Sequence, residues 1–593
     1  MNDLVFNVAA SATGRAWQWR AAPLPLGEAA RMGTDDLAAA LFLARGCAPA
    51  DVARLLKPTL KDWMPDPSVF RDMDAAAVRI ADAVQTGERI TVFADYDVDG
   101  ATSAAILIRL LRQLGASPGH YIPDRMLEGY GPSVDALLAL RAEGTQLLLL
   151  LDCGTQAFAE LEAAKAAGLQ VIVVDHHKAS TALPMAIALV NPNRLDETQE
   201  AAAFGHLCTA GLAFLLAAAV NRELRRRAFF ADRAEPRLSE MLDIVALGTV
   251  ADVVPLLGLN RAFVSLGLKR MADRRNPGIS ALFDIAAHDR APQAEDLGFV
   301  LGPRINAGGR VGKADLGVRL LTTDDRQEAA MLAEELDRLN VERRAIEAAV
   351  MEEALAASAQ HGNSAVAVLA GEGWHPGVVG IVAARVKERL GKPAIVIAVG
   401  ADGVGKGSGR SVEGVDLGAA ILAAKDAGVV LAGGGHAMAA GVTVAAGGID
   451  RLATFLNERL EGAVAAASVG RSLNVDLAVS PAGVCTALAD ALKSAAPYGQ
   501  GWPSPRVATG PLRLLKVDRV GKTAPGEHVR FVGVGADGGR VQGVSFRTAD
   551  TALGQYLLSA GDAQVYLAGR VVLNEWQGRV RAELHLDDAA PAR

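Results

Sequence analysis

Acidic residues crowd together at one point of this sequence. In the segment DYDVDG (95–100), Asp95, Asp97 and Asp99 occupy alternate positions directly after an apolar run. Carboxylates this close repel each other by about 1 kcal/mol per pair in water, and by more in a cleft of lower effective dielectric constant. Divalent cations would neutralise that repulsion, because hard cations take carboxylate oxygens as ligands. The segment therefore indicates a metal site.

Three further segments carry acidic residues or histidines beside apolar runs. They are LLDCGT (150–155) with Asp152, VVDHHK (173–178) with Asp175, His176 and His177, and GTVADVVP (248–255) with Asp252. Carboxylate oxygens combined with imidazole nitrogens suit Mn²⁺ particularly well, and Mg²⁺ is an acceptable alternative. Together the four segments predict a site for two divalent cations.

The strands and helices expected around these segments would bring them together. Short apolar runs at 90–94, 147–151 and 171–174 alternate with helical patterns at 101–114 and 157–167. Continuous apolar strands that alternate with helices predict a parallel sheet covered on both faces. In such sheets, ligands bind at the carboxyl ends of the strands. The acidic segments are therefore expected along one edge of the sheet.

Each of these residues also has an ordinary structural explanation. A single aspartate after a strand, such as Asp152, is usually a helix N-cap, and Asp99 before Gly100 suits a turn. An isolated pair of histidines is more often structural than metal-binding. None of these explanations accounts for four acidic segments, one with two adjacent histidines, at the same sheet edge.

The rest of the chain divides into regions of different pattern. Residues 1–85 are rich in Ala and Leu and are expected to be mainly helical. A long helical stretch at 325–360 would span about 54 Å, which suits a connector between two lobes. Strand–helix alternation returns at 364–460. The Gly-rich hairpin pattern within 470–590 fits a small β-barrel of the oligonucleotide-binding type.

Composition limits the classes of protein. The 593 residues are 51% hydrophobic and 21% charged, so the chain can bury substantial cores. The longest apolar stretch, 207–220, is shorter than the ~18 residues that indicate a membrane span, and the N-terminus lacks the features of a signal peptide. Four widely spaced cysteines without a CxxC pair indicate neither a disulfide framework nor a zinc site. We therefore expect a protein of a reducing cytoplasm, without a membrane partner.

The charge distribution is uneven. A net charge of −7 counts mildly against a general nucleic-acid binder. Locally, residues 506–547 contain eight Lys or Arg and three Asp or Glu, and residues 222–227 contain four arginines. The simplest explanation of either basic run is a solvated face.

The motifs DYDVDG, the lone Asp152, DHH and Asp252 resemble the four motifs of the DHH phosphoesterase superfamily. More narrowly, nearly the whole chain resembles the bacterial single-strand-specific 5′→3′ DNA exonucleases of that superfamily. The matching segments are 43–67, YIPDRMLEGYG (121–131), TVADVVPL (249–256), PRINAGGR (303–310) and, in the accessory DHHA1 domain, KGSGRS (406–411) and GGGHAMAAG (433–441). Ala94, Tyr498 and Trp502 depart from the family pattern, but none of them is an implied metal ligand.

The resemblance implies an α/β protein in which a parallel-sheet DHH domain is joined by a long helix to a smaller α/β DHHA1 domain, followed by a C-terminal β-barrel. The implied parts are an N-terminal helical segment (1–85), the DHH catalytic domain (86–324), the connecting helix (325–360), the DHHA1 domain (361–465) and an OB-like nucleic-acid-binding domain (466–593).

Transferred position by position, the resemblance implies metal ligands at Asp95, Asp97, Asp99, Asp152, His176 and Asp252. Asp152 would bridge two ions, and Asp175 would orient an imidazole through its second nitrogen. Two divalent ions, Mn²⁺ or Mg²⁺, would stabilise the attacking and leaving oxygens of an in-line displacement at a phosphodiester. The implied catalytic residues are Asp97, Asp152, His176, His177, Asp252 and His436.

The resemblance also implies where the substrate binds. The GGGH run would place the backbone N–H groups of Gly434 and Gly435 around an anion, and His436 would donate to the scissile phosphate. Without the resemblance, a flexible turn is the simpler explanation of the three glycines. Arg125 and Tyr130 would hold and stack on nucleotides, and Ser408, Arg410 and Arg304 or Arg310 are the candidates for a 5′-phosphate pocket. Asn306 is a further implied substrate-binding residue.

The expected function is a metal-dependent exonuclease that is specific for single-stranded DNA and releases 5′ mononucleotides in DNA repair and recombination. A monomer is expected, with single-strand-binding protein and a helicase as candidate partners. One alternative is a DHH phosphoesterase that acts on short RNA oligomers or cyclic dinucleotides. Another is a non-catalytic replication scaffold, although such a protein would be expected to have lost metal ligands. A simple nucleic-acid-binding module would leave the acidic segments unexplained.

Overall fold

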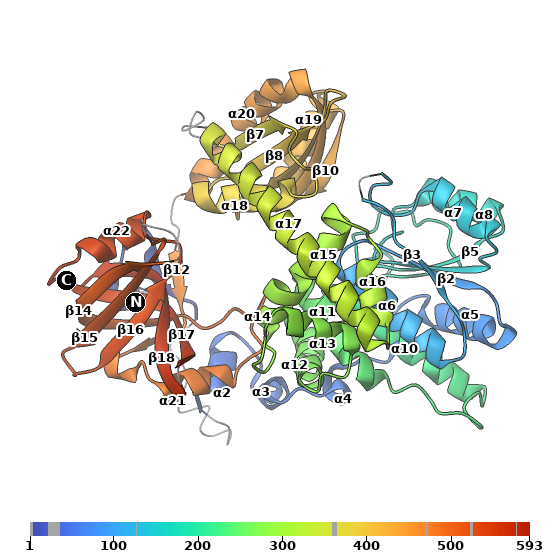
Figure 1. The fold of residues 1–593 in the computed structure, drawn as a ribbon, viewed down its shortest axis with the longest axis horizontal. Coiled ribbons are helices and arrows are strands. Elements are labelled where there is room, and N and C mark those ends of the chain that lie inside the picture. Colours follow the sequence, from blue (N-terminus) through green and yellow to red (C-terminus); the bar gives the residue numbers. More distant parts are fainter. Residues whose placement is uncertain are drawn as a thin grey trace. The chain divides into compact units, whose positions relative to one another are not determined.

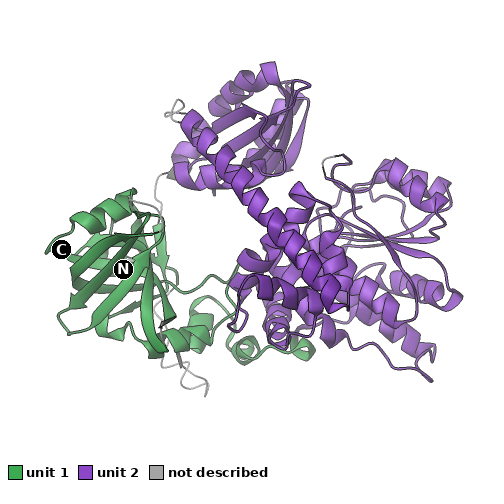
Figure 2. Ribbon diagram, viewed as in Figure 1, with its two compact units in different colours: residues 1–62, 468–593 green, residues 63–467 purple. Residues whose placement is uncertain are grey.

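The computed structural model describes residues 4–21, 36–125, 127–358, 364–468, 472–521, 526–576 and 578–592 (Figure 1). The chain divides into two compact units, one formed by residues 63–467 and the other by residues 1–62 together with 468–593 (Figure 2). Among the helices of the described residues, none is both long and apolar enough to cross a bilayer.

The larger unit begins with a five-stranded parallel sheet. Its strands, in spatial order, are β3 (Gly119–Tyr121), β2 (Ile90–Ala94), β4 (Leu147–Leu151), β5 (Gln170–Val174) and β6 (Ala188–Val190). Every side chain of β2 and β4 is buried, because helices cover both faces of the sheet. The parallel sheet predicted from the apolar runs is confirmed, with strand ends within one residue of the expected positions.

Helices cover the two faces of this sheet. On one face, α7 (Val134–Ala142) and α8 (Phe158–Ala166) bury Leu148, Leu150 and Val173 in a common core. The other face packs against three helices: α5 (Met73–Thr86), α6 (Val98–Gln113) and α10 (Thr209–Arg226).

A layer of further helices follows on that second side. It consists of α11 (Leu242–Ala251), α12 (Gly258–Ala272), α13 (Pro277–Ile285), the π-helical turn η4 (Leu297–Leu301), α15 (Gly302–Val311) and α16 (Leu316–Thr322).

The connecting helix is α17 (Arg326–Ser358), which has 33 residues and is therefore about 50 Å long. Its first half packs against α13 and α15, and its second half packs against α18 (Val379–Leu390). The helix predicted at 325–360 is thus present. The last two residues of that prediction lie outside the described residues.

A second, mixed sheet follows the connecting helix. Its spatial order is β10 (Ala432–His436), β11 (Ala439–Ala445), β9 (Val404–Arg410), β8 (Ala394–Val399) and β7 (Ala367–Glu372). One core forms with α19 (Leu417–Asp426) and α20 (Ile449–Ser468), and another forms with α17 and α18. The GGGH run lies in the edge strand β10, so both a Gly-rich nest and a flexible turn were wrong expectations for its local structure.

The smaller unit contains a β-barrel. The strands run in the order β13 (Leu477–Val479), β14 (Val507–Val520), β15 (His528–Gly535), β16 (Arg540–Ser545), β18 (Arg579–Pro591) and β17 (Gln564–Trp576). The pairing of β14 with β17 closes the barrel. Helix α22 (Ala552–Ser559) follows β16 and precedes β17 in the chain. The oligonucleotide-binding type of barrel and its hairpin of β15 and β16 are confirmed.

The first residues of the chain add a strand to this unit. Strand β1 (Ala16–Trp19) pairs in parallel with β12 (Ser472–Val475), and Trp17 is buried with its indole N–H donating to Asp588 Oδ2 at 3.1 Å. A mainly helical segment was expected here. Three short helices follow, α2 (Asp36–Ala44), α3 (Pro49–Leu56) and α4 (Leu60–Trp63), and the 3₁₀ turn η2 (Pro67–Val69) already belongs to the larger unit. The strand escaped prediction because it is only four residues long and its partner lies far away in the sequence.

Candidate metal centre

The tips of three neighbouring strands carry three of the acidic segments. Asp95 follows β2, Asp152 follows β4, and Asp175 follows β5. The register pairs Ala94 with Leu151, and Leu151 with Val174, so the three strands end at the same level. Their acidic residues therefore meet at one edge of the sheet, as the sequence predicts.

Asp97 begins helix α6. Its Oδ1 accepts the backbone N–H groups of Asp99 at 2.8 Å and Gly100 at 3.0 Å, which makes it the N-cap. A Cβ on Gly100 would lie 2.2 Å from the carbonyl oxygen of Asp95. Only glycine lets the acidic loop fold this tightly against the start of the helix.

Asp99 connects α6 to the start of α10. Its two carboxylate oxygens accept the backbone N–H groups of Thr209 at 2.7 Å and Ala210 at 2.9 Å. The residue at the N-cap of α10, Cys208, makes no capping hydrogen bond with its side chain, so Asp99 supplies the missing acceptor. Because it lies between these two helices, Asp99 is buried, with only 1% of its surface exposed.

Asp152 is held in an unusual backbone conformation. Its φ is +60°, a left-handed conformation that Asp tolerates better than most residues, and it is 2% exposed. Helix α8 starts only at Phe158, so Asp152 is not the N-cap that a lone aspartate would suggest. The hydroxyl of Thr209 donates to Asp152 Oδ1 at 3.0 Å. Thr209 was not singled out in the sequence, where its only signal is its place before a long apolar helix.

Asp175 fixes the histidine pair. Its Oδ1 accepts the N–H groups of His176 and His177 and lies 2.6 Å from His177 Nδ1. Burial alone would raise the pKa of Asp175, but the hydrogen bond from His177 lowers it. In the same way, burial opposes but Asp175 raises the pKa of His177. The imidazole that Asp175 orients is therefore that of His177.

Tyr130 also supports this part of the site. Its hydroxyl donates to the carbonyl oxygen of Asp152 at 3.0 Å and lies 3.2 Å from His177 Nδ1. Loss of hydration, followed by the charge of Asp175, raises the pKa of the phenol, so it remains a neutral donor. The side chain is nevertheless 54% exposed.

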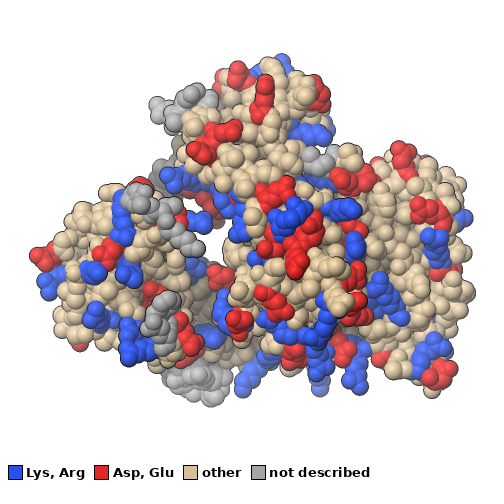
Figure 3. All heavy atoms as spheres, viewed as in Figure 1, with Lys and Arg blue, Asp and Glu red and all other residues tan. Residues whose placement is uncertain are grey.

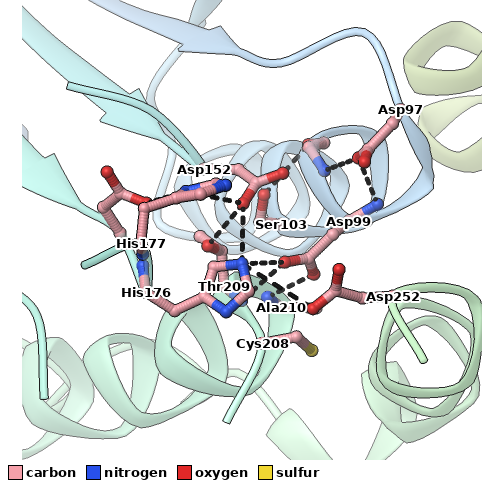
Figure 4. Close-up of polar contacts among 12 residues, drawn as sticks. Asp97, Asp99, Ser103, Asp152, His176, His177, Cys208, Thr209, Ala210 and Asp252 are labelled. Carbon is pink, nitrogen blue, oxygen red and sulfur yellow. Dashed lines mark hydrogen bonds and ion pairs between the residues drawn. The ribbon is translucent and has the colours of Figure 1, made fainter. Parts of the chain in front are cut away.

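His176 faces three carboxylates at once. Its Nε2 lies 3.4 Å from Asp152 Oδ1, 3.7 Å from Asp252 Oδ2 and 3.9 Å from Asp99 Oδ2 (Figure 4). Asp252 follows helix α11 rather than a strand, but its carboxylate joins the other acidic residues as expected. It reaches the cluster because the end of α11 lies beside the start of α6.

Within the described residues, three overlapping sets of side chains could hold a metal ion. They are Asp95, Asp97 and Asp152; Asp99, His176 and Asp252; and Asp152, His176 and His177, with the ligand atoms of each set within 4.8 Å of one another. Asp152 and His176 each belong to two sets, which suits two adjacent ions that share a bridging carboxylate.

The charges of this cluster fit cations. Asp95 Oδ1 and Asp252 Oδ2 are buried without a hydrogen-bond donor among the described residues. Burial, followed by repulsion from Asp97, raises the pKa of Asp95 to about 8. Burial, followed by repulsion from Asp99, raises the pKa of Asp252 to about 9. Divalent cations would supply the missing partners, and oxygen donors with one or two imidazoles are the ligands of Mn²⁺ and Mg²⁺.

A cationic site lies directly beside the acidic one, and Tyr96 joins them. The guanidinium of Arg125 stacks on the Tyr96 ring at 5.2 Å, and a Cβ on Gly309 would lie 2.7 Å from the Tyr96 carbonyl oxygen. Arg310 follows Gly309 and donates to the carbonyl oxygen of Gly377 at 2.9 Å. Burial and then Arg125 lower the pKa of Arg310 to about 10.

Arg410 belongs to the same site. It donates to Ser408 Oγ at 2.9 Å, and burial followed by the charge of Arg125 lowers its pKa. In the described part of the chain, Arg125, Arg310 and Arg410 form no ion pair with a carboxylate. Three guanidinium groups next to the acidic cluster can hold an anion.

Among the described residues, no hydrogen bond or ion pair joins the other predicted substrate-binding residues to this arrangement. Arg304 donates to Asp337 Oδ1 at 2.9 Å and to the carbonyl oxygen of Val300, so its guanidinium is occupied. Asn306 is half-buried in α15. No hydrogen bond or ion pair among the described residues joins His436 to the acidic cluster.

The glycines of strand β10 differ in their surroundings. Gly434 has open space around its Cβ position. Gly435 has a φ of +149°, and a Cβ there would lie 2.3 Å from the Ala439 carbonyl oxygen, so only glycine fits.

Carboxylates and histidines gather at the strand tips of a parallel sheet, and three arginines that can bind an anion lie beside them. This arrangement defines a metal-dependent phosphoesterase of the DHH class. The models of three families match: the DHH family, N-terminal domain, at 89–249, the DHHA1 domain at 362–462 and the RecJ OB domain at 475–588. The chain belongs to the RecJ family of single-stranded-DNA-specific exonucleases.

The relatives are similar over most of their length. The RecJ exonuclease of Dickeya dadantii is 38% identical over 86% of this chain and 88% of its own, and that of Escherichia coli is 37% identical over 88% and 90%. The crystal structure of Thermus thermophilus RecJ with Mn²⁺ is 30% identical and matches with a TM-score of 0.76 over 96% of this chain and 79% of its own. The structure of that RecJ with Mg²⁺ matches with a TM-score of 0.70.

Proposed function

We propose that this protein is a metal-dependent exonuclease that degrades single-stranded DNA from its 5′ end and releases 5′ mononucleotides. The observation that carries this proposal is the contact of the acidic cluster with the cationic site through Tyr96. A terminal phosphate bound by Arg125, Arg310 and Arg410 would place the next phosphodiester near the metal ligands. The relatives named as single-stranded-DNA-specific exonucleases support the choice of substrate.

The proposed ligands are the six residues implied by the family resemblance: Asp95, Asp97, Asp99, Asp152, His176 and Asp252. Two divalent cations, Mn²⁺ or Mg²⁺, would lower the pKa of the attacking water and stabilise charge on the displaced oxygen. Other residues of the chain hold the side chains of this site in position. Thr209 holds Asp152 and Asp175 holds His177, so these side chains are positioned before the substrate arrives.

The basic run at 222–227 does not contribute to this proposal. Its arginines pair with neighbouring carboxylates: Arg222 with Asp66 and Asp74, Arg225 with Glu235, and Arg226 and Arg227 with Glu223. Basic and acidic side chains are also interspersed on the face shown in Figure 3. A solvated face explains this run, as expected.

The barrel unit offers a different surface, which we propose binds the single strand. Register places Arg530 opposite Val544, Val544 opposite His585, and His585 opposite Arg570. Directly opposed residues share one face of a sheet, so the two arginines flank His585 on the outside of the barrel. Within the described residues, neither arginine forms an ion pair.

An exposed aromatic side chain lies in the same surface. Phe546 is 51% exposed, and its ring contacts the rings of His528 at 5.4 Å and His585 at 5.0 Å. Bases stack on aromatic rings with little regard to sequence, while arginines hold the phosphates. The barrel would therefore bind DNA without sequence preference.

The cellular setting is part of the proposal. We place the protein in the cytoplasm as a monomer that acts in DNA repair and recombination with single-strand-binding protein and a helicase. All four cysteines are free thiols, which suits a reducing compartment. Gel filtration at the concentration used for activity assays would measure the oligomeric state.

The function is tested by incubating 5′-labelled single-stranded DNA, duplex DNA and a dinucleotide with Mn²⁺. Release of labelled mononucleotide from the single strand alone, and its loss on adding a chelator, is the expected result. Turnover of the dinucleotide but not of the longer strand would favour a phosphoesterase of short oligomers. Release of an internal fragment before any mononucleotide would contradict an exonuclease.

A further inference from the structure

The turn between β7 and α18, with the sequence WHPGV, lies against Arg310. Gly377 of this turn accepts a hydrogen bond from Arg310 Nη1. A Cβ on Gly377 would lie 2.6 Å from the carbonyl oxygen of Arg310 and 2.9 Å from Nδ1 and Cε1 of His375. The imidazole of His375, Gly377 and the backbone of Arg310 are therefore packed against one another without space for a side chain.

The start of α18, directly after this turn, lies against Arg410. A Cβ on Gly380 would be 3.2 Å from Arg410 Nη2 and 3.2 Å from Ser408 Oγ. The turn thus separates two of the three guanidinium groups of the anion site. Arg125, the third, is near enough for its charge to act on His375 as well as on Arg310 and Arg410.

The hydrogen bonding of His375 fixes its tautomer. Its Nδ1 accepts the backbone N–H of Gly377 at 3.0 Å, so in the neutral imidazole the proton is on Nε2. Burial lowers the pKa of His375; the charge of Glu342 opposes this effect, and the charge of Arg125 adds a smaller lowering. At neutral pH the half-buried ring therefore carries an N–H donor that points away from Gly377.

We propose that His375 is a substrate-binding residue that donates its Nε2–H to the 5′-terminal phosphate. This inference rests on the proposed function and extends it. It adds a neutral, directional hydrogen-bond donor to a phosphate site otherwise formed by arginine side chains. Arginines attract any anion. A donor of fixed tautomer would instead favour a terminal phosphate over a terminal hydroxyl.

Two substitutions separate this role from a structural one. His375→Asn keeps an acceptor near the Nδ1 position for Gly377 but removes the Nε2 donor. His375→Gln can place an amide N–H near the Nε2 position but lacks the Nδ1 acceptor. His120→Asn, on strand β3, is the matched control.

The measurements are KM and kcat on single-stranded DNA with a 5′-phosphate and with a 5′-hydroxyl. For His375→Asn we expect KM to rise about tenfold with the 5′-phosphate substrate and to stay unchanged with the 5′-hydroxyl substrate. His375→Gln should recover part of the discrimination, and His120→Asn should match the wild type. Binding of the same two oligonucleotides without divalent cation, followed by fluorescence anisotropy, should show the same ratio.

An equal loss on both substrates, or an unchanged ratio in His375→Asn, would overturn the inference. Failure of the wild type to degrade single-stranded DNA would instead count against the proposed function. In that case the anisotropy ratio still decides the role of His375, because it does not depend on turnover. Melting temperatures establish that each variant is folded.

Discussion

At the scale of single residues, the centre consists of clustered carboxylates whose repulsion is unfavourable unless cations are bound. Asp95, Asp99, Asp152 and Asp252 lie together, and burial with repulsion between carboxylates raises the pKa of each of them. Such an arrangement is unfavourable in the absence of metal, because the buried carboxylates repel one another and Asp95 Oδ1 and Asp252 Oδ2 accept no hydrogen bond from the described residues. Binding energy from the cations offsets that cost. Stability and chemistry therefore oppose each other at these positions.

Asp152→Asn tests this opposition. Asn tolerates the left-handed backbone and can still accept the hydroxyl of Thr209, so the variant should fold. We expect turnover to fall by at least about a hundredfold, because loss of a metal ligand exceeds loss of an outer partner. In metal-free buffer the melting temperature should be equal to or above that of the wild type. Near-normal kcat in a folded variant would contradict the role of Asp152.

At the scale of elements, tight junctions position the acidic residues. The turn from β2 into α6 depends on Gly100, where a Cβ would collide with the carbonyl oxygen of Asp95. Gly462, in helix α20, has open space around its Cβ position instead. The two glycines therefore predict opposite outcomes of the same substitution.

Gly100→Ala should lower the free energy of unfolding by about 1–3 kcal/mol, because backbone must shift to make room. Since the shift moves Asp95 and Asp97, metal affinity should fall as well. Gly462→Ala should raise stability by up to about 1 kcal/mol, since alanine is the better helix former. Urea unfolding and a metal titration measure both effects. Equal stability changes in the two variants would refute this account of the junction.

Helix α11 contains a buried carboxyl that should make stability depend on pH. Burial raises the pKa of Asp243 to about 6, although the N–H of Ile244 donates to it. Because the folded-state pKa lies above the unfolded one, the protonated carboxyl favours the folded state. Its contribution is fully present below the unfolded value of 3.8 and is lost as pH rises through about 6.

Asp243→Asn should remove this dependence. Relative to the wild type, the variant should become more stable as pH increases from 4 to 7, by up to about 3 kcal/mol. Urea unfolding at several pH values measures the difference, and Asp135→Asn, an exposed residue of α7, serves as control. A difference that does not change with pH would show that the carboxyl titrates alike in both states.

At the scale of the whole molecule, the two ends of the chain build one unit. Strand β1 pairs with β12, and Trp17 donates to Asp588. Deleting the C-terminal region would therefore also expose a buried tryptophan near the N-terminus. Point substitutions on the barrel surface are the appropriate test of DNA binding by this unit.

Arg530→Gln should weaken binding of single-stranded DNA and reduce the slope of log affinity against log salt by about 0.7, as expected for one lost phosphate contact. Arg513→Gln is the matched control, because Arg513 already pairs with Asp562 on the same barrel. Phe546→Ala should weaken binding without changing the slope, since stacking is not ionic. Unchanged slopes in both arginine variants would remove the barrel surface from the DNA-binding site.

The sequence by itself determined the strands that carry the proposed metal site. Short apolar runs ending in acidic residues are local signals, so the positions of Asp95, Asp152 and Asp175 at strand tips could be predicted from neighbouring residues alone. The same applies to the connecting helix and to the hairpin of the barrel, whose patterns repeat over many residues.

Only the tertiary structure decided which partners those residues meet. Asp252 arrives from a helix, Thr209 holds Asp152, and Asp337 occupies Arg304. Strand β1 exists because of β12, and the GGGH run is a strand because β11 lies beside it. Each of these features depends on a contact between segments with no shared periodicity. Burial, hydrogen bonding and charge between distant segments are properties of packing, and no local pattern of residues encodes them.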